Sequence, residues 1–133
     1  MRRKSSWLWS TGRVSDAAAD GSPRLLLLTL RSSRLRYLHS RQILHRDIKL
    51  ENVLLDGEGY VRLTDFNVAK VLEERRTFSM KGTLFCMAPE VILKKGHDAA
   101  ADFWSLGVLI FEMVTGGPPF FSADKAELKR QGT

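Results

Sequence analysis

Four polar residues in a short stretch of the chain could perform chemistry on a phosphate group: Asp47, Lys49, Asn52 and Asp65. Carboxylate and amide oxygens are hard ligands that suit Mg²⁺, an ion that also binds phosphates. A lysine beside them would place a positive charge where a phosphoryl group is transferred. Asp and Asn next to turns are also common caps and turn formers, so residue type alone leaves both interpretations open.

The spacing of these residues favours the chemical interpretation. Four motifs follow one another along the chain: His-Arg-Asp-Ile-Lys-Leu-Glu-Asn (45–52), Asp-Phe (65–66), Ala-Pro-Glu (88–90) and Asp-Phe-Trp-Ser-Leu-Gly (102–107). Their order and spacing resemble the protein kinase superfamily over about Leu35 to Lys129. Within it, Lys49 and the pair Gly82-Thr83 are similar to the serine/threonine branch, and this implies transfer of the ATP γ-phosphate to protein Ser or Thr hydroxyls.

The resemblance implies a role for each residue of the site. Asp47 would accept or orient the proton of the substrate hydroxyl, and Lys49 would steady the transferred phosphoryl group. Asn52 and Asp65 would hold the Mg²⁺ ions that bridge the ATP phosphates. Leu54 would lie beneath the adenine ring. ATP and Mg²⁺ are therefore the expected cofactors, and a protein with an accessible Ser or Thr is the expected partner.

The resemblance also implies regulation within the activation segment, residues 65–90. Arg46 would pair with a phosphate on this segment, so Ser79 and Thr77 are candidate sites for a regulatory kinase. Thr83 would help to select a substrate residue that carries a hydroxyl group.

Residues outside the site would support it. His45 and Phe66 would belong to a packed internal column, with His45 a satisfied core histidine and not an acid–base group. Asp102 would bind back to the backbone of the catalytic loop, and Trp104 would anchor its helix in the core.

The sequence also departs from the family pattern. Asn67 stands where the Asp-Phe-Gly motif has glycine, and asparagine tolerates left-handed backbone well enough for the turn to form. Cys86 replaces a common tyrosine. We find neither the Gly-rich loop nor the strand lysine of a kinase, and no arginine to pair with Glu90.

We therefore expect a fragment of a kinase, inactive alone, marginally stable and with weak ATP affinity. The alternative is a non-catalytic, pseudokinase-like interaction module that uses the same lobe as a docking surface.

Composition excludes several other classes. The 133 residues carry a net charge of +6, but without an aromatic platform or finger spacing no specific nucleic-acid binding is predicted. The single cysteine excludes an intrachain disulfide and fits a reducing compartment, so a cytoplasmic location is predicted. No apolar run approaches the roughly 18 residues that a membrane span needs.

The expected fold is mainly α with a small β-hairpin: a partial kinase-like C-terminal lobe that lacks the N-terminal lobe and the last helices. Residues 1–24 are predicted to be a flexible leader, although their basic, serine-rich start also fits a transit peptide, and residues 25–133 to be the partial kinase domain. Within this domain we predict the following elements: a helix over 24–40, strands at 53–56 and 60–66, a long loop over 67–89, a buried helix over 102–115 with Asp102 as N-cap, and a last helix over 123–131.

Overall fold

The computed structural model describes residues 12–13, 34–56, 58, 60–122 and 124–132. Its helices are α3 (Leu35–Ser40), α4 (Pro89–Ile92), α5 (Ala100–Thr115) and α6 (Lys125–Gln131), with single 3-10 turns at Leu50–Asn52 and Leu84–Cys86. Its strands are β1 (Gly12–Arg13), β2 (Ile43–Leu44), β3 (Val53–Leu55), β4 (Val61–Leu63) and β5 (Lys70–Val71). Within the described ranges, none of the helices combines the length and the apolarity that a membrane crossing requires.

Two small antiparallel sheets position the loops of the molecule. The predicted hairpin is confirmed: β3 pairs with β4, and Leu54 lies opposite Arg62. Beyond the prediction, β1 adds a third strand beside β3. It lies in the segment predicted as a leader, the rest of which falls outside the described residues. A second sheet joins β2 to β5, so part of the predicted 67–89 loop is a strand.

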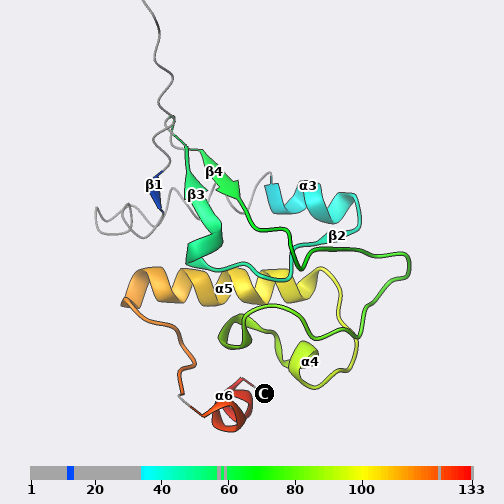
Figure 1. Cartoon of the computed structure of the whole chain (residues 1–133), viewed down its shortest axis with the longest axis vertical. Coiled ribbons are helices and arrows are strands. Elements are labelled where there is room, and N and C mark those ends of the chain that lie inside the picture. Colours follow the sequence, from blue (N-terminus) through cyan, green and yellow to red (C-terminus); the bar gives the residue numbers. More distant parts are fainter. Residues whose placement is uncertain (1–11, 14–33, 57, 59, 123, 133) are drawn as a thin grey trace, which may run out of the picture.

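Helix α5 crosses the middle of the molecule, with the β3–β4 hairpin and α3 on one side and α4 and α6 on the other (Figure 1). Towards the hairpin it closes one core, made of Leu35, Ile48, Val53, Val61, Leu106 and Leu109. Towards α4 a smaller core contains Met87, Ala88, Val91 and Ala101. Because the catalytic-loop residue Ile48 is part of the first core, packing on α5 fixes the position of this loop.

The structure corrects the prediction for the central helix. It begins at Ala100, so Asp102 lies in the first turn and is not the N-cap. It ends as predicted, where Gly116 adopts a left-handed conformation with φ of 82°. The helix is not buried on all sides, because Phe111 is 46% and Val114 is 66% exposed. Part of the apolar surface of this helix therefore faces solvent.

The prediction that Trp104 anchors this helix in the core is wrong. Its side chain is 36% exposed and stacks on Phe120, with ring centroids 6.1 Å apart. The buried face of α5 is formed instead by smaller side chains, because residues three and four positions apart share one side of a helix. Among these, Leu109 is completely buried and Ser105 is 6% exposed.

Candidate functional site

The side chain of Asp47 lies at the centre of a closed hydrogen-bond network. Its Oδ1 accepts bonds from the backbone N–H (2.9 Å) and the hydroxyl (2.6 Å) of Thr83. Its Oδ2 accepts a bond from the amide nitrogen of Asn52 at 2.9 Å, and Nζ of Lys49 lies 3.3 Å away. Lys49 also donates to the Thr83 hydroxyl at 2.9 Å. The structure therefore brings together three residues of the sequence motif and one from the activation segment.

These contacts determine the charge of Asp47. Burial by itself would raise the pKa of its carboxyl group, but the hydrogen bond from Thr83, the charge of Lys49 and the bond from Asn52 outweigh it and hold the pKa below the ordinary value. Asp47 is thus an ionised acceptor at neutral pH. A carboxylate fixed in this way can orient a hydroxyl group that approaches it.

Gly82 allows the activation segment to approach the catalytic loop. Its φ is 114°, and a Cβ atom built on it would collide with the carbonyl oxygen of Arg46. Only glycine takes this conformation and this contact without strain. The close approach places the next residue, Thr83, against Asp47.

Asn52 and Asp65 are less closely associated than the sequence suggested. Asn52 is buried and makes both of its side-chain bonds through the amide nitrogen, to the side chain and to the backbone oxygen of Asp47. Its amide oxygen therefore has no partner within the described residues. Asp65 is exposed, and within the part of the chain that the structure describes its carboxylate accepts a hydrogen bond only from the N–H of Asn67, at 3.3 Å. A bond of 2.9 Å from Thr64 N to Asn52 O brings the two backbones together without joining the side chains.

The left-handed backbone of this turn lies at Asp65 and not at Asn67. Asp65 has a φ of 59°, whereas Asn67 is not among the described residues with positive φ. The turn therefore forms without a left-handed conformation at position 67, and the tolerance of asparagine for that conformation is not needed there. Leu54, the residue expected beneath the adenine ring, is half-buried in β3.

Asp102 holds the start of the catalytic loop, and this prediction is confirmed. The residue is 1% exposed. Its carboxylate accepts three hydrogen bonds, from the backbone N–H of His45 (2.9 Å), the backbone N–H of Arg46 (2.8 Å) and Nε2 of His39 (2.8 Å). The bond to Arg46 supports an unusual backbone, since this arginine has a φ of 67°.

His45 is a packed histidine, as expected. Its Nε2 donates to the backbone oxygen of Thr64 at 3.0 Å, while Nδ1 accepts the N–H of Asp47 at 3.3 Å. Its ring meets that of Phe66 edge to face at 4.7 Å. Both ring nitrogens therefore have partners, which is typical of a structural role.

Arg46 reaches the activation segment. Its guanidinium donates to the backbone oxygen of Val68 and to the hydroxyl of Ser79, both at 2.6 Å. The Ser79 hydroxyl lies 3.2 Å from that of Thr77, which in turn accepts a bond of 3.0 Å from Lys70. Two cations therefore converge on two hydroxyl groups, and of these Thr77 is only 3% exposed.

Two acids that interact electrostatically, Glu51 and Glu112, were not predicted as site residues from the sequence. Glu112 is half-buried on α5, and its pKa is raised by burial and by the charge of Glu51. The same two acids also affect the thiol of Cys86. Burial raises the pKa of this thiol to about 12, and the charges of Glu112, Asp47 and Glu51 raise it as well. Glu112 could have been found in the sequence, because it is the only acid after Asp102 in an otherwise apolar helix.

Comparisons with known proteins identify the family of the chain. The sequence profile of the family described as "Protein kinase domain" matches residues 27–133. The chain belongs to this family.

Its relatives are serine/threonine kinases. It is 57% identical over 89 residues to a cGMP-dependent protein kinase, isozyme 2 forms cD5/T2, of Drosophila melanogaster. The aligned residues make up 66% of this chain and 10% of the relative. It is 47% identical over 116 residues to the cAMP-dependent protein kinase catalytic subunit PRKX of Mus musculus, and the aligned residues make up 87% of this chain and 31% of that relative. It is 53% identical over 92 residues to the serine/threonine-protein kinase AtPK1/AtPK6 of Arabidopsis thaliana, and the aligned residues make up 68% of this chain and 20% of that relative. The chain thus spans between about a tenth and a third of the length of these relatives.

Proposed function

We propose that the chain contains the phosphate-transfer centre of a serine/threonine protein kinase, within the large lobe of the kinase domain. The observation that carries this proposal is the network around Asp47, in which Thr83, Asn52 and Lys49 fix one ionised carboxylate. The catalytic-loop aspartate of a kinase must be fixed in this way, because catalysis of phosphoryl transfer is mostly positioning and charge stabilisation.

Each residue then takes a role that its surroundings support. Asp47 accepts the proton of the substrate hydroxyl, and Lys49, 3.3 Å from it, stabilises the negative charge of the transferred group. The unpartnered amide oxygen of Asn52 and the exposed carboxylate of Asp65 are oxygen ligands that suit Mg²⁺. The Mg²⁺ ions would neutralise the charge of the ATP phosphates, and Leu54 would contact the base.

The acid pair Glu51 and Glu112 supports a preference for basic substrates. The charge of Glu51 raises the pKa of Glu112, which shows that the two carboxylates repel each other. A guanidinium group between them would relieve that repulsion. Both acids, together with Asp47, raise the pKa of the Cys86 thiol, so all three carboxylates act on this one group. We propose that a basic side chain close to the target Ser or Thr binds there.

This proposal can be tested with a chimera in which residues 27–133 replace the matching segment of the mouse relative. Mg²⁺-ATP and two serine peptides are supplied, one with arginines before the serine and one with alanines. We expect phosphate on serine and a lower KM for the arginine peptide, and we expect Glu51→Gln with Glu112→Gln to remove that difference. Failure to phosphorylate either peptide would refute the kinase function, whereas equal KM values would refute only the substrate preference.

Between the two candidate regulatory sites, the contacts favour Ser79. Its hydroxyl is bonded to Arg46, whereas Thr77 is buried, and a phosphate on Ser79 would gain a charge-assisted bond. After treatment with an upstream kinase, mass spectrometry should locate the phosphate on Ser79 in the wild type. Ser79→Ala should lose the phosphate and Thr77→Val should keep it; phosphate found on Thr77 would contradict the assignment.

The alternative, a non-catalytic interaction module, is favoured by one observation. Apolar side chains of α5, among them Phe103 and Val114, are about half exposed or more. An exposed apolar surface is typical of a site that another protein covers.

A cytoplasmic location stays a prediction, supported by the single buried thiol of Cys86.

A further inference from the structure

His97 carries an unsatisfied polar atom. Its side chain is buried. Among the described residues, Nε2 is the single side-chain nitrogen or oxygen atom that is itself fully buried and also lacks a hydrogen-bond partner. Its backbone is fully engaged, since it donates to Thr77 O at 2.8 Å and accepts from Thr77 N at 2.9 Å. Buried polar atoms nearly always have a partner, often an ordered water. A hydrogen-bond partner for Nε2 of His97 is therefore expected, and an ordered water is a common one.

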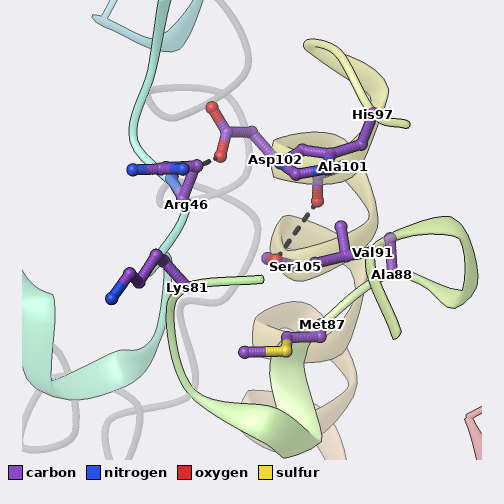
Figure 2. Close-up of a pocket in the computed structure, with 9 residues that line it drawn as sticks. All are labelled: Arg46, Lys81, Met87, Ala88, Val91, His97, Ala101, Asp102 and Ser105. Atoms are coloured by element: carbon purple, nitrogen blue, oxygen red, sulfur yellow. Dashed lines mark hydrogen bonds between the residues drawn. The ribbon is translucent and has the colours of Figure 1, made fainter. Parts of the chain in front are cut away.

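A small cavity lies beside this histidine. Its volume is about 10 Å³, and its polar lining comes from Arg46, Lys81, His97, Asp102 and Ser105 (Figure 2). In Figure 2 Arg46 and Asp102 meet at the catalytic-loop side of the cavity, and His97 stands beside the first turn of α5. A cavity of this volume holds about one water molecule, and a bound water needs two to four polar partners. The volume excludes a phosphate or any organic ligand.

Two of the lining groups can bind the water together with His97. The carboxylate of Asp102 accepts three bonds and, like any carboxylate, has lone pairs for about four. The hydroxyl of Ser105 donates to Cys86 O at 2.7 Å, and this leaves its oxygen free to accept. A water in the cavity would therefore reach a sufficient number of partners.

We propose that one buried water links Nε2 of His97 to Asp102, and that His97 is thereby a positioning residue for the catalytic loop. Asp102 holds the N–H groups of His45 and Arg46, directly before Asp47. His97 also holds Thr77 through its backbone. The same histidine thus connects the activation segment to the carboxylate that shapes the loop. This role in the reaction rests on the proposed kinase function.

The charges around His97 favour the neutral ring that such a link needs. Burial lowers the pKa of His97, and the positive charge of Arg46 lowers it further. Three acids act in the opposite direction without reversing the shift: Glu90, Asp102 and Asp98. Lys81, which lines the cavity, is a further cation on this side. The neutral ring can both accept a hydrogen bond from a water and donate one to it.

Nuclear magnetic resonance on the full 133-residue chain tests the water directly. We expect a nuclear Overhauser effect between the His97 ring and one long-lived water in the wild type, absent in His97→Phe. His97→Gln is the matched variant, because its Nε2 can occupy the position of the histidine Nε2. An absence of long-lived water in the wild type overturns the inference, and this measurement needs no variant to fold.

The positioning role has its own readout. The Arg46 and His45 amides should exchange with solvent about tenfold faster in His97→Phe than in the wild type, and His97→Gln should restore slow exchange, because a weakened hold on Asp102 lets the loop open locally. Unchanged exchange in the phenylalanine variant overturns the role. Neither measurement uses ATP, so a failure here is distinguishable from a failure of the kinase assay.

Discussion

Replacing Asp47 with asparagine in the kinase chimera should lower the rate of phosphate transfer by at least about 100-fold, the lower end of what a positioned general base contributes. Asparagine has nearly the same size and keeps one oxygen for Thr83, but it carries no charge. It can neither accept the proton of the substrate hydroxyl nor pair with Lys49. The initial rate of transfer from radiolabelled ATP to the arginine peptide measures the effect.

Asp124→Asn is the matched control for this variant. Asp124 is exposed and caps α6 by accepting the N–H of Ala126 at 2.8 Å. Asparagine is an equally good cap, so the same change of charge should leave both folding and transfer unaffected. A chimera with Asp47→Asn that is as fast as this control would refute the role of Asp47.

Asp102→Ala should produce the largest loss of stability, about 3–5 kcal/mol, the range found when one partner of a buried charged network is removed. The variant leaves the buried N–H of His45, the partly buried N–H of Arg46 and the Nε2 of His39 without an acceptor. Small domains are stabilised by only about 5–15 kcal/mol in total, so this variant should be largely unfolded well before the wild type. Urea unfolding of the 133-residue chain, followed by Trp fluorescence, measures the shift.

The comparison variant is Asp124→Ala, which removes an exposed carboxylate and one capping bond. It should cost about 1 kcal/mol, as the loss of an N-cap does. If Asp102→Ala shifts the urea midpoint no further than Asp124→Ala, the catalytic loop does not depend on the Asp102 carboxylate.

The sequence predicted the elements whose causes are local. The turn residues 56–59 and the alternation of Val61, Arg62 and Leu63 predicted the hairpin, because period-two burial is a property of the strand itself. The apolar run and Gly116 likewise predicted α5 and its end. The identities of Asp47, Asn52 and Lys49 followed from their spacing, and the structure brings these three side chains together.

The remaining features depend on distant contacts, which no local pattern contains. Asp102 has the residue type of an N-cap, yet its carboxylate binds the backbone of His45 and Arg46 far away in the sequence, and the helix starts earlier. Trp104 is the largest residue of its helix, yet smaller neighbours occupy the buried face. Glu112 acquires its raised pKa from its burial and from Glu51, and only the packing of α5 beside the catalytic loop brings these two acids close enough to interact.

The carboxylate of Asp102 also has a consequence for the order of folding. It shapes residues that precede it by 57 positions, at His45, and by 56, at Arg46. During synthesis the catalytic loop leaves the ribosome well before α5 exists, so its two backbone N–H groups first meet water. Contacts between residues so far apart form late, because a long loop must close first. The residues most closely tied to chemistry in this chain are therefore among the last to reach their final geometry.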